Sequence, residues 1–303
     1  MVALFGRSRA AQLATPPSAR PFDSASSSTS RKRPAERSAP FPRTGRIDTT
    51  ARNRHYCRPM STPHGDEWSG RRLDDADFSH ACLHSPNFEG VKITDGWLAN
   101  ADISAFIGGL RINGVMIAPL VTAELDRMFP ERILLRAGDP NGLAEAWTLI
   151  ERVWADTVSR VRALPAALLS ERVDGEWSFL ETLRHLIFAT DCWYYRMIRR
   201  SEHPYHPWGV AASFSDAAAI GLDGTANPGL DEILGVRTHR MDAVKATIQG
   251  LDAQELERIC EPPATPGQPT EAHSVLECLH VILDEEWEHS RYANRDLEVL
   301  FAR

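Results

Sequence analysis

The chain has 303 residues, of which 43% are hydrophobic and 25% charged, a composition typical of globular proteins with one large domain or two modest ones. No run approaches the roughly 20 apolar residues that cross a bilayer, and the N-terminus does not resemble a secretory signal, so we expect a cytoplasmic protein without a membrane partner. Residues 1–59 carry a net charge of +9 and residues 60–303 carry −16, and this acidic body predicts no binding to nucleic acid.

Residues 1–59 form a basic tail rich in Ser, Arg and Pro, without a helical or strand period. Such a segment cannot bury enough apolar surface to offset the entropy lost on ordering, so we expect it to be disordered. Met60 opens a segment that resembles a natural start, and the residues before it then belong to upstream translation or to a disordered tail. A basic arm for nucleic acid is the alternative interpretation of the tail.

Residues 72–118 contain a repeat with a period of five. Its clearest blocks read ADFSH, ACLHS, PNFEG, VKITD, GWLAN and ADISA, and their central residues are Phe78, Leu83, Phe88, Ile93, Leu98 and Ile103. This period fits neither a helix nor strand alternation, but it suits a square solenoid whose sides each point one apolar residue inward. The segment resembles a pentapeptide-repeat β-helix of about two coils. We expect it to cap the next domain rather than to mimic DNA.

Residues 138–303 have the patterns of four amphipathic helices, predicted at residues 139–164, 178–200, 230–249 and 274–300. An Asp-Pro pair suits the start of the first helix. Ser178 and Ser274 each precede a Glu by three residues, which is a capping box, and Gly250 ends the third helix. Because a long Pro- and Gly-rich connection lies between the second and third helices, the sequence predicts a mainly α fold, a four-helix bundle with one long crossover.

Three residues of the second and fourth helices form the candidate site. Glu285 and His289 are four residues apart and therefore share one helix face, while His185 lies on an apolar face of the second helix. A carboxylate and an imidazole are costly to bury unpaired, and a divalent cation would satisfy both, with His185 as the third ligand. Spacing alone leaves open that each histidine is an ordinary core or surface residue and that Glu285 belongs to a solvated acidic run.

The segments GEWSFLETLRHLIFATDCW and ECLHVILDEEWEHSRYANRDL resemble the second- and fourth-helix motifs of the DinB superfamily of metal-binding four-helix bundles. His185, followed by an aromatic residue eight positions later, matches the histidine of the second helix. The E-x-x-x-H pair of Glu285 and His289 matches the mycothiol-dependent maleylpyruvate isomerase branch. The resemblance covers about residues 138–300 and implies these three residues as metal ligands. The N-terminal repeat is not typical of those isomerases, so their substrate is not carried over.

Two histidines and one carboxylate leave a coordination position open, which is typical of a catalytic site. Zinc is our first choice, and nickel, iron and cobalt suit the same ligands. The resemblance favours an S-transferase or isomerase that uses a low-molecular-weight thiol, such as mycothiol, and a small electrophilic substrate; a homodimer is compatible with it. Two alternatives stay open: a metal-dependent hydrolase with Glu288 as its base, and a non-catalytic binding or scaffold protein with a structural metal.

Other polar residues near the site are predicted to miss the metal. His280 should face away from Glu285 and His289, and Asp191 lies about 240° around the second helix from His185. The crossover segment HPYHPWG either lines the mouth of the site or forms a turn packed by aromatic and proline residues, and we favour the turn.

The five cysteines are scattered, odd in number and without CxxC spacing. This pattern predicts reduced thiols in a cytosol rather than a disulfide framework.

Overall fold

The computed structural model describes residues 68–83, 86–211 and 217–303, and these fall into two units that divide after Cys82. The expectations for residues 1–59 and for a start at Met60 lie outside the described residues. In the described part of the chain, no helix is both long and apolar enough to span a membrane.

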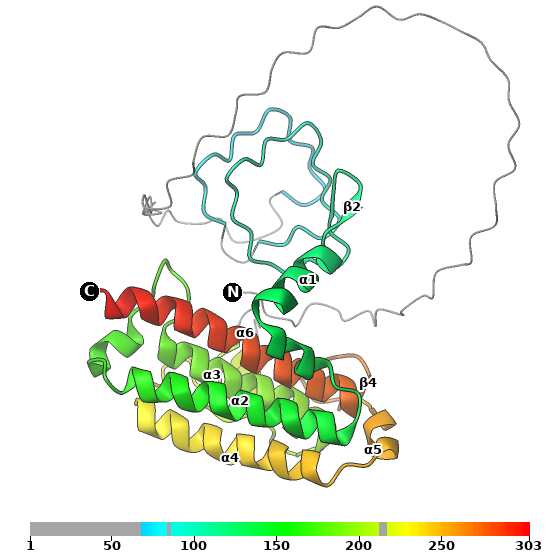
Figure 1. Ribbon diagram of the computed structural model, residues 1–303, viewed down its shortest axis with the longest axis vertical. Coiled ribbons are helices and arrows are strands. Elements are labelled where there is room, and N and C mark those ends of the chain that lie inside the picture. The colour runs from blue at the N-terminus through cyan, green and yellow to red at the C-terminus, as the bar shows by residue number, and fades with distance from the viewer. Residues whose placement is uncertain (1–67, 84–85, 212–216) are drawn as a thin grey trace, which may run out of the picture. The chain divides into compact units, whose positions relative to one another are not determined.

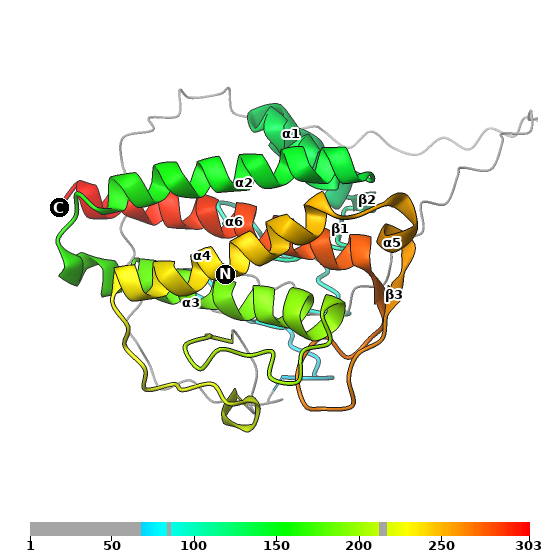
Figure 2. The same cartoon turned by 90° about the horizontal axis from the view of Figure 1, so that it is seen from below.

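Four long helices run side by side and form the body of the second unit, as Figures 1 and 2 show. They are α2 (Pro140–Val161), α3 (Phe179–Thr190), α4 (Leu230–Gln249) and α6 (Val275–Phe301). A π-helical segment, η3 (Asp191–Ile198), continues α3 and completes the predicted second helix. The prediction of four helices with one long crossover is therefore confirmed.

The helix starts follow from side chains in the first turn. Asp139 accepts hydrogen bonds from the backbone N–H groups of the next turn and caps α2. Ser178 caps α3 and Ser274 caps α6, and each forms a complete capping box with the glutamate three residues later. These local bonds satisfy backbone donors that a helix start would otherwise leave unpaired.

The bundle core is apolar but contains two ion pairs, one buried and one partly buried. Leucine, isoleucine and tryptophan side chains from all four helices are almost fully buried. The Arg237 guanidinium of α4 lies 2.7 Å from the Glu286 carboxylate of α6, and both side chains are at most 4% exposed. Arg240 of α4 lies 2.8 Å from Asp191 of η3. These pairs connect α4 to the two helices that carry the candidate site.

The crossover between η3 and α4 is held to the bundle by a buried arginine. Arg184 of α3 donates to the carbonyls of Trp208 and Ala226, both at 2.8 Å. The short helix η4 (Ala217–Ile220) lies in this crossover. Because Arg184 is adjacent to His185, these bonds bring the crossover backbone beside the candidate site.

Short elements occupy the remaining connections. Between α4 and α6 the chain forms α5 (Ala253–Glu257) and a two-residue antiparallel ladder of β3 (Ile259–Cys260) and β4 (His273–Ser274). Before α2 it forms a second small ladder of β1 (Arg111–Ile112) and β2 (Val115–Met116), then α1 (Ala118–Met128) and the 3₁₀ helix η1 (Pro130–Arg136). Helix η1 contacts both α2 and α6.

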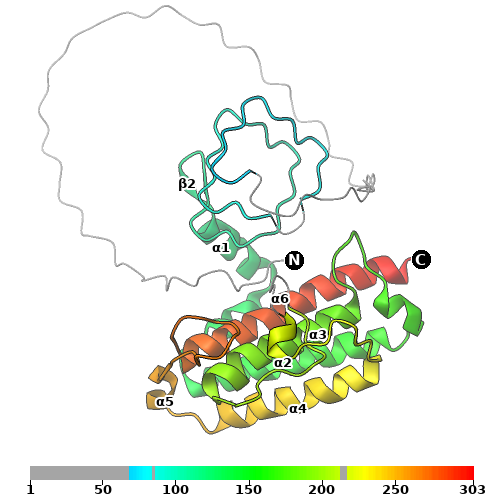
Figure 3. The same cartoon turned by 180° about the vertical axis from the view of Figure 1, so that it is seen from behind.

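The five-residue period before α1 is visible in the backbone. From residue 86 to α1 the chain winds as a coil in Figures 1 and 3. Positive φ angles recur at five-residue steps, at Gly70, Asp75 and His80 before the division between the units and at Gly90, Asp95 and Asn100 after it. Turn hydrogen bonds recur every ten residues, from the N–H of residues 71, 81, 91 and 101 to the carbonyl three positions earlier. The repetition predicted from the sequence is thus a property of the local backbone.

The closed β-helix expected for residues 72–118 is not present among the described residues. Strands occur there only in the β1–β2 ladder. The expected inward side chains, Phe78, Leu83, Phe88, Ile93, Leu98 and Ile103, are between 51% and 63% exposed. Our expectation of a buried apolar interior was therefore wrong: a coil of so few turns leaves its side chains without a layer of neighbours to cover them.

Cysteine oxidation also departs from the expectation of five reduced thiols. Cys82 is disulfide-bonded. Cys192, Cys260 and Cys278 are free and buried in the second unit. The prediction of reduced thiols therefore holds for the three bundle cysteines.

Candidate metal centre

His185, Glu285 and His289 meet in the interior of the bundle. Their ligand atoms all lie within 4.8 Å of one another. The exposed fractions of His185, Glu285 and His289 are 0%, 1% and 2%. Helix α3 supplies one of these side chains, and α6 supplies the other two from consecutive turns. The structure therefore brings together the three residues that the sequence singled out.

The crossover backbone orients His185. Its Nδ1 donates to the carbonyl of Val210 at 2.9 Å, which directs Nε2 towards the Glu285 carboxylate, 3.3 Å away. A carbonyl accepts only, so the proton of a neutral imidazole belongs on Nδ1 and Nε2 keeps its lone pair. Two lone-pair-bearing atoms at this distance repel each other unless a proton or a cation lies between them. Such a carbonyl contact is typical of histidines that bind metals.

His289 is held in the same way by its own helix. Its Nδ1 lies 2.9 Å from the backbone carbonyl of Glu285, to which it donates. The other ring nitrogen, Nε2, is buried and has no hydrogen-bond partner among the described residues. Burial and the neighbouring His185 ring lower the pKa of His289 to about 4, so the ring is neutral at pH 7. A buried neutral nitrogen without a partner fits the donor set of a divalent metal ion.

Aromatic rings surround the two histidines. The His185 and His289 rings stack with centroids 4.7 Å apart, and the Trp177 ring lies 4.6 Å from the His185 ring and 6.3 Å from the His289 ring. Tyr292 meets His289 edge-on at 6.3 Å. Trp177 and Tyr292 are partly exposed, whereas the histidines are buried. These two rings therefore help to shield the buried histidines from solvent.

Glu288, the candidate base, is held by two arginines. Its carboxylate lies 2.6 Å from Arg291 in the next turn of α6 and 3.4 Å from Arg132 of η1. It is not one of the residues whose ligand atoms converge within the described part of the chain.

The other polar residues that the sequence singled out each contact groups outside the three candidate ligands. His280 Nε2 contacts the Ala137 carbonyl at 2.8 Å and is not one of the three candidate ligands. Asp191 binds Arg240 and accepts from the His206 N–H at 2.8 Å, and burial raises its pKa to about 6. His206 accepts from the Trp208 N–H, as in a packed turn, and His203 is exposed.

Sequence reasoning missed two parts of the site. Val210 acts through its backbone carbonyl, so its residue type carries no signal. Trp177 immediately precedes the Ser178 cap, a position where apolar residues often pack against the helix they precede, and that position could have drawn attention to it. Its contact with both histidines depends on the approach of α3 to α6.

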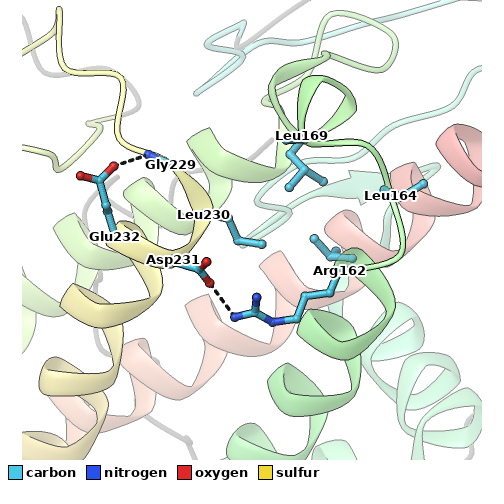
Figure 4. Close-up of a pocket in the computed structure, with 9 residues that line it drawn as sticks. Arg162, Leu164, Leu169, Gly229, Leu230, Asp231 and Glu232 are labelled. Carbon is cyan, nitrogen blue, oxygen red and sulfur yellow. Dashed lines mark hydrogen bonds and ion pairs between the residues drawn. The ribbon is translucent and has the colours of Figure 1, made fainter.

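A cavity of about 450 Å³ lies apart from the metal centre, between the end of α2 and the start of α4 (Figure 4). Its lining includes Leu164, Leu169 and Leu230, and Arg162 pairs with Asp231 at 2.7 Å across it. None of the three candidate ligands lines this cavity, so its size is no guide to the site.

Comparison with known proteins agrees with the geometry. Residues 149–293, which include all three candidate ligands, match the family model of the DinB superfamily. No curated protein and no solved structure matches the chain. The match supports a DinB-like assignment of the helical bundle.

Proposed function

We propose that this chain is a metal-dependent DinB-like protein in which His185, Glu285 and His289 hold one divalent cation. The observation that carries the proposal is the convergence of three buried donors, one of which, His289 Nε2, has no hydrogen-bond partner among the described residues. Burying His289 Nε2 without a partner costs free energy, and a cation held by the three side chains would supply that partner. Zinc is our first choice because imidazole suits it, and nickel, iron and cobalt suit the same ligands.

The protein residues define an open and preorganised site. Within the described residues no fourth His, Cys, Asp or Glu joins the group, so three ligands would leave at least one position for a small molecule. The Val210 carbonyl orients the His185 ring, and the α6 backbone orients the His289 ring. Trp177 and Tyr292 limit the access of bulk water, and a low local polarity strengthens electrostatic interactions inside the site.

The reaction class that we propose is a thiol-dependent S-transfer or isomerisation in the cytoplasm. When bound, the cation would act as a Lewis acid that favours the deprotonated form of a low-molecular-weight thiol, such as mycothiol or a similar compound. A buried site beside the Trp177 and Tyr292 rings suits such a thiol and a small electrophilic substrate better than it suits a macromolecule.

A hydrolase is less well supported by the geometry. A general base must reach the water from which it takes a proton, and Glu288 is instead engaged by Arg132 and Arg291. We therefore assign it no catalytic role. The other alternative is a structural metal site without an open coordination position, and the experiment must distinguish it from a catalytic site.

Metal content and cobalt spectroscopy of the full chain test the proposal. We expect about one divalent ion per chain in the wild type, and loss of most of it in His185→Ala and in His289→Ala. His280→Ala is the matched control because this histidine lies in α6 but bonds to Ala137, and it should keep its metal. Equal metal content in all four proteins would refute the ligand assignment.

The cobalt-substituted protein then separates the functional classes. If the thiol enters the coordination shell, adding it should produce a sulfur-to-cobalt charge-transfer band in the near ultraviolet. A hydrolase would turn over substrate without any thiol. A spectrum typical of four protein ligands, unchanged by millimolar thiol, would overturn the enzyme proposal in favour of a scaffold with a structural metal.

A further inference from the structure

The connection between α2 and α3 covers part of the candidate metal centre with one aromatic ring. Figures 1 and 2 show this connection at the C-terminal end of α6. It leads to Trp177, whose ring lies 4.6 Å from the His185 ring and 6.3 Å from the His289 ring. Because both histidines are at most 2% exposed, a molecule from solvent reaches them only when a group that covers them moves.

The groups that cover the histidines differ in how firmly the fold holds them. Phe188 belongs to α3 and Tyr292 to α6, so helix hydrogen bonds fix the backbone of both. The crossover contributes the Val210 carbonyl, and Arg184 fastens that segment with two bonds of 2.8 Å. Trp177 is partly exposed and precedes the first residue of α3. Its displacement therefore disturbs less of the fold than displacement of the other three groups.

The segment that carries this ring is a short turn between two buried anchors. Val173 and the α3 cap Ser178 are 4% and 3% exposed, and the ring belongs to the four residues between them. Asp174 and Gly175 have φ angles of 52° and 80°, and the Glu176 N–H donates to the Val173 carbonyl at 3.0 Å, which closes the turn. Movement of four residues between fixed anchors would displace the ring and leave both helices in place.

An ion pair ties this turn to α6. The Glu176 carboxylate lies 3.0 Å from Nη2 of Arg295, and it directly precedes Trp177 in the chain. The same guanidinium pairs with Asp296 at 2.8 Å and lies over the Tyr292 ring, 5.5 Å from its centroid. Since the Arg295 side chain is 47% exposed, water and salt weaken its pair with Glu176. Such a pair favours the closed turn and still allows it to open.

We propose that residues 174–177 form a gate of the metal centre, which the Glu176–Arg295 ion pair latches and the Trp177 ring closes. When the pair breaks, the turn moves away from α6 and a small molecule reaches the open coordination position. When the pair forms again, the ring excludes bulk water from the site. The inference rests on the proposed function, because it assigns the entry route of that same site.

Modification of His289 by diethyl pyrocarbonate measures how often the gate opens. The reagent acylates a neutral imidazole at a nitrogen that carries a lone pair, and His289 Nε2 is a buried nitrogen without a hydrogen-bond partner among the described residues. The full chain is freed of metal with a chelator, treated at pH 7 and digested, and tandem mass spectrometry locates the adduct. If the turn opens and closes faster than the reagent reacts, the rate of modification follows the population of the open state.

Three variants test the ring and its latch. Trp177→Ala should be modified at His289 at least about tenfold faster than the wild type, because the covering ring is gone, and Trp177→Phe should be modified at an intermediate rate. Glu176→Gln should accelerate the reaction about two- to fivefold, the range that loss of an exposed ion pair supports. Arg295→Met should accelerate it at least as much as Glu176→Gln does.

Arg291→Met is the matched control for the loss of an arginine from α6. Arg291 pairs with Glu288 at 2.6 Å and lies over the Phe129 ring, 4.7 Å from its centroid, so its removal deletes the same two kinds of contact without touching the latch. Its rate of His289 modification should equal that of the wild type. Raising the NaCl concentration to about 1 M screens the latch, so it should accelerate modification of the wild type and leave the rate of Glu176→Gln unchanged.

Two results would overturn the gate. One is a wild-type rate that salt does not change, which is informative even if a variant fails to fold, and the other is a Trp177→Ala rate equal to that of the wild type. Metal content is measured separately on the same proteins. A chain that binds no metal but follows the expected rates would refute the proposed function and support the gate, whereas a metal-binding chain with uniform rates would do the reverse.

Discussion

Replacing His289 with leucine should make the protein more stable than the wild type without metal, and less stable than the wild type when zinc is present. Leucine removes a buried nitrogen, Nε2, that has no hydrogen-bond partner among the described residues, and it keeps most of the side-chain volume. Leaving such a group unpaired costs about 1–3 kcal/mol, and the lost bond from Nδ1 to the Glu285 carbonyl offsets about 1 kcal/mol of the gain. Without metal, the variant should therefore be up to about 2 kcal/mol more stable than the wild type.

Zinc should reverse that order because only the wild type keeps all three ligands. A ligand at about 100 times its Kd stabilises the folded state by about 2.7 kcal/mol. Urea unfolding followed by circular dichroism, with chelator and with zinc, measures both differences. His280→Leu is the control: it loses one bond to Ala137 and should cost about 1 kcal/mol in both conditions. A His289→Leu protein that is less stable than the wild type by the same amount in both conditions would show that His289 is an ordinary core residue.

Three further predictions concern the scaffold. Arg237→Met should destabilise the fold by about 3–5 kcal/mol in urea unfolding, because it leaves Glu286 buried without its partner, whereas Arg162→Met at an exposed ion pair should cost at most about 1 kcal/mol. Ile93→Asp should change the unfolding free energy by at most about 0.5 kcal/mol, since Ile93 is 63% exposed, and a larger loss would show that the repeat has a covered interior. The pKa of the Asp191 carboxyl is raised from 3.8 to about 6 in the folded protein, so the folded state binds a proton there more tightly than the unfolded state does. As the pH falls from 6 towards 4, the unfolding free energy of the wild type should therefore increase relative to that of Asp191→Asn. A difference between the two proteins that does not change with pH would contradict this.

The sequence alone determined the features that depend on neighbours a few residues apart. Ser178 and Ser274 cap their helices through glutamates three residues later, so both helix starts were predictable. Glu285 and His289 share a face because they are four residues apart in one helix. The five-residue repeat likewise sets a recurring backbone turn.

Only the tertiary structure decided what those local elements face. His185 and Glu285 are 100 residues apart, and no local rule specifies that their side chains approach within 3.3 Å. The Val210 carbonyl reaches His185 because Arg184 holds the crossover against α3. The apolar positions of the repeat are largely exposed because burial requires a covering layer, which spacing along the chain does not supply. Periodicity specifies which side chains share a face, whereas burial and coordination depend on which distant segments pack against that face.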